Sequence, residues 1–168
     1  LQTEQGTHYS RAVVVTAGGG AFTPKRLPGR EYQQYEGRGL HYFITELMAF
    51  RGKQIVVIGG GDSAVDWALN LRRVTDRIMV VHRRDKFRAH EDSVAKLYAS
   101  GAEIRTFHEL KALHGGERVE AATLYDNRTM EEVKVPADAV LELDLRASTA
   151  AAMAEAEAAI RAAIAAPA

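Results

Sequence analysis

The chain has 168 residues, of which 46% are hydrophobic and 26% charged, a composition typical of a globular protein that buries one core. Its 22 Lys and Arg residues balance its 22 Asp and Glu residues, so it lacks the positive excess that binders of nucleic acid or of anionic membranes need. The absence of cysteine excludes disulfides, thiolate metal sites and dithiol redox chemistry within the chain.

Short aliphatic runs alternate with helical patterns along much of the chain. Residues 32–39 show no clear period, and residues 41–50 fit either a short helix or an extended segment. Strands that alternate with helices imply a parallel sheet. The predicted strands are residues 11–16, 53–58, 77–82 and 103–107, and the predicted helices are 62–73 and 91–100. The apolar face of the first helix comprises Ala64, Val65, Ala68, Leu69 and Leu71, and that of the second comprises Val94, Leu97 and Tyr98.

The pattern then changes to shorter alternating strands. Residues 109–136 contain turn signals at Gly115-Gly116 and Asp126-Asn127, which predicts antiparallel hairpins. A last strand is predicted at residues 139–145. The predicted fold class is α/β: a Rossmann-like parallel sheet with flanking helices, an antiparallel hairpin insertion and a C-terminal helix.

The two ends of the chain are less informative. The alanine-rich residues 147–168 predict one helix over 149–165, which is either a packing or solubilising segment or a partner-binding helix. The first residue is Leu1 rather than Met, so we expect a processed, excised or engineered piece. No apolar run approaches the roughly 20 residues of a membrane span, and no secretory signal is visible. We therefore expect a cytoplasmic protein that binds no membrane and no nucleic acid.

The most specific motif is the glycine turn GGGDSA, which directly follows a predicted strand and opens a predicted helix. In the G-x-G-x-x-A pattern, Gly59 permits the tight turn, Gly61 has no Cβ to block a pyrophosphate, and Ala64 lets the helix pack closely on the strand. Ser63 could add a hydroxyl donor. Asp62 is also a natural N-cap, which is its alternative role. The motif predicts dinucleotide binding at a helix N-terminus, and the alternative is a tight turn that binds no ligand.

A basic segment follows about 20 residues later, where an NAD-binding site would place an acidic residue against the ribose. Here the sequence has Arg83, Arg84 and Arg88, whose guanidinium groups suit a 2′-phosphate. His82 could contribute a ring N–H, or it could be a structural histidine at the end of a strand. The pattern favours NADP(H) over NAD(H), and the alternative for the arginines is a solvated basic turn.

Metal and nucleophile chemistry find no support in the sequence. His90, Glu91 and Asp92 match no zinc-ligand spacing, so they predict a polar helix start. Ser63 and His82 do not form a catalytic pair, because the serine belongs to the glycine turn. We therefore assign no catalytic residue and no metal ligand.

Residues 37–141 resemble the NADPH domain of the thioredoxin-reductase-like flavoproteins. The segments GGGDSAVDWAL and VHRRDKFRAHEDSVAKL are similar in particular to the ferredoxin/flavodoxin–NADP⁺ reductases of this type. Thioredoxin reductases have a C-x-x-C dithiol where this chain has Phe43-Ile44-Thr45-Glu46. The resemblance therefore favours the ferredoxin/flavodoxin reductase branch and excludes disulfide reduction.

The resemblance implies FAD as a second cofactor in the parent family, with hydride transfer between nicotinamide and flavin and electron transfer to ferredoxin or flavodoxin. It implies that residues 1–39 are a remnant of an FAD domain with its linker, that residues 40–146 bind NADP(H), and that residues 147–168 are an unrelated tail. Because no FAD-binding turn is visible, we expect this chain to bind NADP(H) without FAD and to have little turnover alone. The alternative is a non-catalytic nucleotide-binding module or an engineered scaffold.

Overall fold

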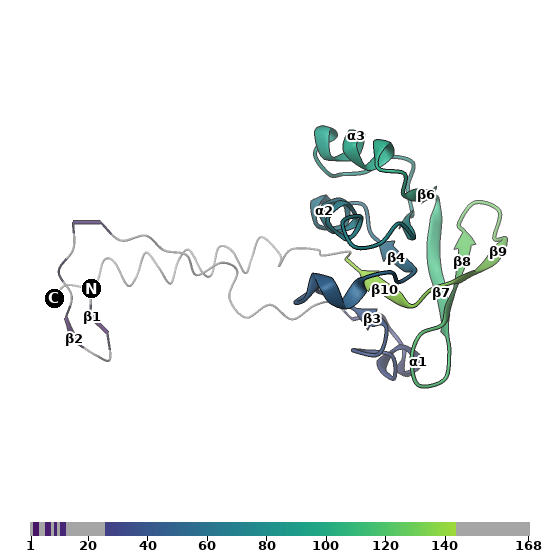
Figure 1. The fold of residues 1–168 in the computed structure, drawn as a ribbon, viewed down its shortest axis with the longest axis horizontal. Helices are drawn as coiled ribbons and strands as arrows, with labels where there is room; N and C mark the ends of the chain where they lie inside the picture. The colour runs from purple at the N-terminus through teal and green to yellow at the C-terminus, as the bar shows by residue number, and fades with distance from the viewer. Residues whose placement is uncertain (1, 4–5, 8, 10, 13–25, 144–168) are drawn as a thin grey trace. The chain divides into compact units, whose positions relative to one another are not determined.

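The computed structural model describes residues 2–3, 6–7, 9, 11–12 and 26–143 (Figure 1). The chain divides into two units, one of residues 24–145 and one of residues 1–23 with 146–168. In the second unit, β1 (Gln2–Thr3) and β2 (Gly6–Thr7) form an antiparallel pair. Residues 13–16 of the predicted strand at 11–16 lie outside the described residues, as does the whole of the predicted helix at 149–165, and residues 11–12 form no strand.

The first unit is built on a five-stranded parallel sheet. Its strand order is β3 (Leu40–His41), β10 (Ala139–Glu142), β4 (Ile55–Ile58), β5 (Ile78–His82) and β6 (Glu103–Thr106). Every neighbouring pair is parallel, as predicted. The chain moves outward from β4 through β5 to β6 and then returns to the other side of β4 as β10. The strand order therefore reverses between β4 and β10.

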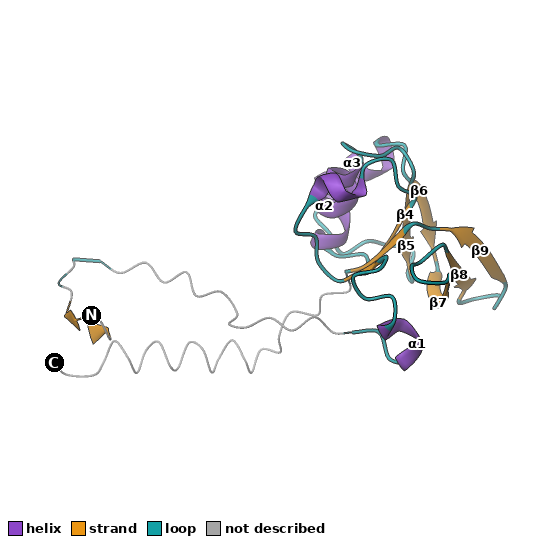
Figure 2. Cartoon of the chain, turned by 60° about the horizontal axis from the view of Figure 1, so that its bottom comes forward, coloured by secondary structure: helices purple, strands orange, loops and turns teal. Residues whose placement is uncertain are grey.

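Two helices cover one face of this sheet, α2 (Asp62–Leu71) and α3 (Glu91–Ala99) (Figure 2). Successive residues of a strand face opposite sides of a sheet, so Ile55 and Val57 of β4 face the helices. On α2, the predicted apolar face is buried except at the partly buried Leu69. On α3, Leu97 is buried but Tyr98 is 57% exposed, so its predicted place on the apolar face is wrong. The Tyr98 ring instead lies edge-on to that of Phe87, with 6.2 Å between the ring centroids.

A three-stranded antiparallel sheet covers the other face (Figure 2). It contains β7 (His108–His114), β8 (Ala121–Asp126) and β9 (Glu132–Pro136), which confirms the predicted hairpins. Leu124 and Val135 from this sheet pack in one core with Val56 and Val81 of the parallel sheet. The hairpins therefore form a third layer of the fold, and their loops reach the end of the parallel strands.

Two short elements lie in the segments without a clear pattern. α1 (Arg30–Gln33) overlaps the start of residues 32–39, and the 3₁₀ turn η1 (Leu47–Phe50) ends residues 41–50, where a short helix was one of the two predicted alternatives. Each has four residues and is too short to show a helical repeat. Tyr32 and Tyr35 are buried, and their hydroxyl groups donate to the carbonyls of Lys111 (2.7 Å) and Gly115 (2.9 Å). Long-range tyrosine contacts, rather than local periodicity, hold this segment.

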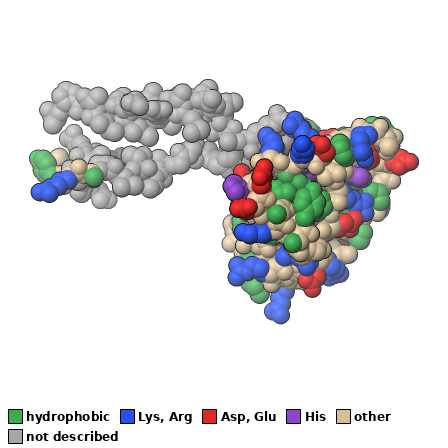
Figure 3. Space-filling view, turned by 90° about the horizontal axis from the view of Figure 1, so that it is seen from above, with side chains coloured by type: hydrophobic (Ala, Val, Ile, Leu, Met, Phe, Trp, Pro, Cys, Tyr) green, Lys and Arg blue, Asp and Glu red, His purple; other side chains and the backbone are tan. Residues whose placement is uncertain are grey.

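The surface shows the charge balance of the composition. On the face drawn in Figure 3, basic and acidic side chains of the described residues are interspersed around an apolar area. Of the described helices, none has both the length and the apolar character that crossing a membrane requires.

Candidate functional site

The glycine turn joins β4 to α2 at the carboxyl edge of the parallel sheet. Gly59 has φ +145°, a conformation that strongly favours glycine. A Cβ built there would lie 2.9 Å from Cβ of Ala64 and 3.3 Å from the Leu143 carbonyl. Ala64 itself is fully buried. The fold therefore requires both small residues, because helix and strand meet closely here.

The other two glycines differ from Gly59. A Cβ on Gly60 would lie 2.1–2.6 Å from ring atoms of His82, so this glycine is required by a side chain of the next strand. A Cβ on Gly61 would meet no atom within 4 Å. Nothing in the described fold requires glycine at position 61. Gly60 occupies a variable position of the motif, so the sequence pattern did not mark it.

The first turn of α2 is capped differently from the prediction. Gly61 is the N-cap, and no side chain bonds to the cap. Asp62 lies inside the helix, and its Oδ1 accepts a hydrogen bond from the backbone N–H of His90 at 2.8 Å. The predicted alternative role of Asp62 as N-cap is therefore wrong. Its carboxylate instead ties the starts of α2 and α3 together, while Ser63 lies partly exposed in the first turn of α2.

His82 ends β5 and is buried. Its ring stacks on Phe87 with 5.0 Å between centroids, and its Nε2 lies 3.0 Å from the carbonyl oxygen of Lys86. Because a carbonyl oxygen only accepts, Nε2 carries the proton, and the ring N–H is used within the chain. These contacts hold the segment after β5 close to the glycine turn. There the backbone N–H of Arg88 donates a hydrogen bond to the Gly60 carbonyl oxygen at 2.6 Å.

Burial lowers the pKa of His82, and the charges of Arg83, Arg84 and Arg88 lower it further, while the hydrogen bond to Lys86 opposes them. His82 is therefore neutral at pH 7.

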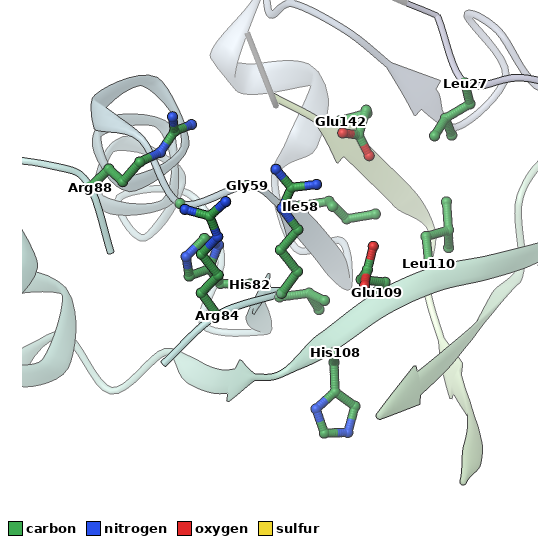
Figure 4. A pocket seen from close by; sticks show the side chains of 13 residues that line it. Leu27, Ile58, Gly59, His82, Arg84, Arg88, His108, Glu109, Leu110 and Glu142 are labelled. Atoms are coloured by element: carbon green, nitrogen blue, oxygen red, sulfur yellow. The ribbon is translucent and has the colours of Figure 1, made fainter. Parts of the chain in front are cut away.

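A cavity of about 150 Å³ opens at the carboxyl ends of β4, β5 and β10 (Figure 4). Arg83, Arg84 and Arg88 line it together with Gly59 and Gly60. This is the point where the strand order reverses, which is where open α/β sheets bind ligands. The three predicted arginines therefore line the same cavity as Gly59 and Gly60, the first two residues of the glycine turn. Of the other predicted residues, His82 lines the cavity, and Gly61, Asp62, Ser63 and Ala64 lie outside its lining.

Sequence motifs did not identify the remaining walls of the cavity. Glu109 and Leu110 come from β7, Glu142 from β10, and Leu27 from the segment before α1. Figure 4 shows the carboxylates of Glu109 and Glu142 turned toward the cavity, with His108 turned away from it. These residues are distant in the sequence from the glycine turn, and no local pattern links them to it.

The described residues contain no group of three His, Cys, Asp or Glu side chains that could hold a metal. His90 is instead the N-cap of α3, and its Nδ1 accepts a hydrogen bond from the Asp92 N–H at 3.4 Å. Glu91 and Asp92 occupy the first turn of that helix. The predicted polar helix start is confirmed.

Residues 1–152 match the protein family described as pyridine nucleotide-disulphide oxidoreductase. The chain is 50% identical over 135 residues to a ferredoxin–NADP reductase of Symbiobacterium thermophilum, a match that covers 80% of this chain and 40% of that protein. It is 45% identical over 144 residues to ferredoxin–NADP reductase 2 of Bacillus subtilis (strain 168), which covers 86% of this chain and 42% of that protein. The chain spans about 40% of the length of the curated relatives it matches.

Solved structures share the fold. A thioredoxin reductase from Streptococcus pyogenes superposes with a TM-score of 0.68 at 25% identity, covering 72% of this chain and 40% of that one. A thioredoxin reductase from Giardia duodenalis gives 0.66 at 27% identity, covering 71% and 40%. The resemblance drawn from the two motifs is confirmed.

Proposed function

Because the chain belongs to the pyridine nucleotide-disulphide oxidoreductase family, we propose that residues 40–146 bind NADP(H), as the coenzyme-binding part of a ferredoxin/flavodoxin–NADP⁺ reductase. The observation that carries the proposal is the convergence of Arg83, Arg84 and Arg88 on one cavity beside Gly59. Within residues 26–143, neither Arg83 nor Arg84 forms an ion pair with a carboxylate. Their guanidinium groups are available to a 2′-phosphate, which they would bind through paired charge-assisted hydrogen bonds.

The glycine turn supports the same proposal. The position of Gly61 is open on the side where a Cβ would project, so a pyrophosphate could approach the backbone there. The ten-residue helix α2 directs its first N–H groups and the positive end of its dipole toward that space. The pyrophosphate would lie over Gly61 to Ser63, and the 2′-phosphate would lie at the end of β5.

The names of the relatives extend the proposal to the whole protein. The two relatives above are ferredoxin–NADP reductases, so the NADP(H) bound here would exchange hydride with FAD, and ferredoxin or flavodoxin would be the electron partner. Among the described residues, only 55–71 form a strand, glycine turn and helix of the dinucleotide-binding type, and we assign that unit to NADP(H). We place no flavin step on these residues, and we propose that this chain binds NADP(H) with little turnover of its own.

The test is a titration of the chain with NADPH and with NADH by calorimetry, with fluorescence of Trp67 as a second signal. Trp67 lies on α2 and packs against the helical core, close to the turn that would bind pyrophosphate. We expect NADPH to bind more tightly, and Arg83→Ala to weaken NADPH binding by about 1.5–3 kcal/mol while leaving NADH unchanged. Equal binding of the two coenzymes by the unsubstituted chain would refute the proposal. Absorbance near 450 nm separately tests for bound flavin, which we do not expect.

A further inference from the structure

The antiparallel sheet reaches the arginine segment through one side chain, Asn127. This residue lies in the turn between β8 and β9, and its Nδ2 donates to the carbonyl oxygen of Arg83 at 2.9 Å and to Oε1 of Glu109 at 3.0 Å. Its backbone N–H donates to the carbonyl oxygen of Phe107 at 2.8 Å. A side-chain amide has two N–H groups, and both are used here. Asn127 therefore joins β7 to the segment that carries the arginines.

Glu109 also lies beside a side chain of the neighbouring strand. It is the cross-strand partner of Tyr125 in the pairing of β7 with β8. Burial, together with the charge of Glu109, raises the pKa of Tyr125. The amide of Asn127 thus orients a carboxylate that lines the same cavity as Arg83.

The position of Arg83 depends on this network. Arg83 directly follows β5, so the parallel sheet no longer holds its carbonyl oxygen, which instead accepts the hydrogen bond from the Asn127 amide. A guanidinium binds phosphate in a bidentate manner only when its direction of approach is defined. Fixing the backbone at the base of the side chain narrows the range of directions that the guanidinium can sample. The carboxylate of Glu109, held in place by the same amide, keeps a negative charge at a defined position in the cavity.

We propose that Asn127 is a positioning residue for coenzyme selection: by holding the Arg83 backbone and the Glu109 carboxylate together, it sets how strongly the cavity prefers a 2′-phosphorylated nucleotide. This rests on the proposed function, because it assumes that the arginines bind the 2′-phosphate. The antiparallel sheet then contributes to specificity although it carries no nucleotide-binding motif.

The test compares Asn127→Ala with the unsubstituted chain in calorimetric titrations with two pairs of ligands. One pair is the fragments 2′,5′-ADP and 5′-AMP, and the other is the coenzymes NADPH and NADH. We expect Asn127→Ala to weaken 2′,5′-ADP and NADPH by about 5–20-fold, the usual cost of one or two lost hydrogen bonds, and to change 5′-AMP and NADH by less than about 2-fold. Asn127→Leu is a second variant of similar size that cannot donate to Glu109 or to the Arg83 carbonyl and adds no charge beside the cavity, and we expect the same selective loss. Circular dichroism and thermal unfolding establish that each variant is folded.

The matched control is Asn70→Ala. Asn70 also donates its side-chain amide to a backbone carbonyl, that of Asp66 at 2.9 Å, but it lies on α2 away from the cavity. We expect it to leave the ratio of the two affinities unchanged. If folded Asn127 variants keep the full preference for the 2′-phosphate, or lose affinity equally for all four ligands, the positioning role is overturned while the proposed function stands. If the unsubstituted chain shows no preference, the proposed function itself fails, and the two failures are thereby distinguished.

Discussion

The two edges of the parallel sheet both carry arginines, but they use them differently. At the amino edge, Arg72 donates to the Asp76 carbonyl at 2.6 Å and pairs with the Asp76 carboxylate at 3.4 Å, and Arg77 donates to the carbonyl of Gly52. At the carboxyl edge, Arg83 and Arg84 face a cavity and pair with no carboxylate in residues 26–143. The first group of arginines bonds to other groups of the protein, and the second is the group that we propose to bind the coenzyme.

The difference follows from the ends of the helices that meet each edge. Arg72 and Arg73 follow the C-terminus of α2, where exposed carbonyls and the negative end of the dipole attract cations. The amino edge also has a hollow of about 330 Å³, whose lining includes Arg51, Arg72 and Arg73 together with Asp76, so arginines beside a hollow do not by themselves distinguish the two edges. What distinguishes the carboxyl edge is the N-terminus of a helix, a glycine turn and the guanidinium groups of Arg83 and Arg84, which pair with no carboxylate in residues 26–143.

The largest expected effect comes from substituting two glycines of that turn one at a time and comparing the effects on stability and on NADPH binding. Gly59→Ala should lower the free energy of unfolding by about 3 kcal/mol, because it combines a strained positive φ with a clash against Ala64. Gly61→Ala should leave the unfolding free energy within about 0.5 kcal/mol of the original value, because its new methyl group meets no atom, yet it should weaken NADPH binding. Urea unfolding and calorimetry of both variants measure these quantities. Gly61→Ala with unchanged affinity would mean that no pyrophosphate approaches this backbone.

The two edges can be compared directly with one pair of arginines. Arg84→Ala should weaken NADPH binding by about 1.5–3 kcal/mol, whereas Arg73→Ala, which removes an equally exposed arginine from the amino edge, should leave it unchanged. Titrations at two salt concentrations show whether any remaining effect of Arg73→Ala comes from long-range electrostatic attraction, which added salt would screen. Similar losses for both variants would show that general positive charge, rather than the carboxyl edge, attracts the coenzyme.

A smaller effect is expected from pH. The pKa of His82 lies below that of an exposed histidine, so the unfolded chain takes up a proton at a higher pH than the folded one. The contribution of His82 to stability is therefore present above about pH 6.5 and decreases as the pH falls below that value. His82→Phe keeps a ring against Phe87 but cannot titrate, so its unfolding free energy should fall less between pH 7 and pH 5. Burial and the charge of Lys53 also lower the pKa of His41, so both proteins retain the loss of stability at low pH that is due to His41. Parallel pH profiles for the two proteins would contradict the assignment.

The smallest effect is expected at the amino edge. Arg72→Ala removes a pair whose acidic partner is 92% exposed, so it should cost at most about 1 kcal/mol of unfolding free energy, and less in high salt. It should not alter the affinity for NADPH or NADH. Chemical unfolding at low and high salt checks the first statement, and a loss above about 2 kcal/mol would mean that the hydrogen bond to the Asp76 carbonyl contributes more than a surface contact normally does.

The sequence by itself determined the features that depend on neighbouring residues. The aliphatic run of β4, the glycine turn and the apolar face of α2 lie within one short stretch, so their spacing identifies a strand, a turn and a helix before any contact is known. The arginines could be placed near the turn because consecutive strands of a parallel sheet end at the same edge. The four-residue α1 escaped prediction, and η1 was only one of two alternatives for residues 41–50, because tyrosine contacts and core packing rather than periodicity hold these elements.

Only the tertiary structure decided which distant residues complete the site. The ring of His82 against Gly60, the carboxylate of Glu109 in the cavity and the amide of Asn127 at the Arg83 carbonyl all join segments separated by tens of residues or by a layer of the fold. Such contacts depend on the order of the strands and on which sheet packs against them. The residues next to a given position in the sequence indicate neither the strand order nor the packing. The type of ligand that we propose therefore rests on local motifs, whereas the contacts that hold the proposed binding groups in place became visible only when the three layers were assembled.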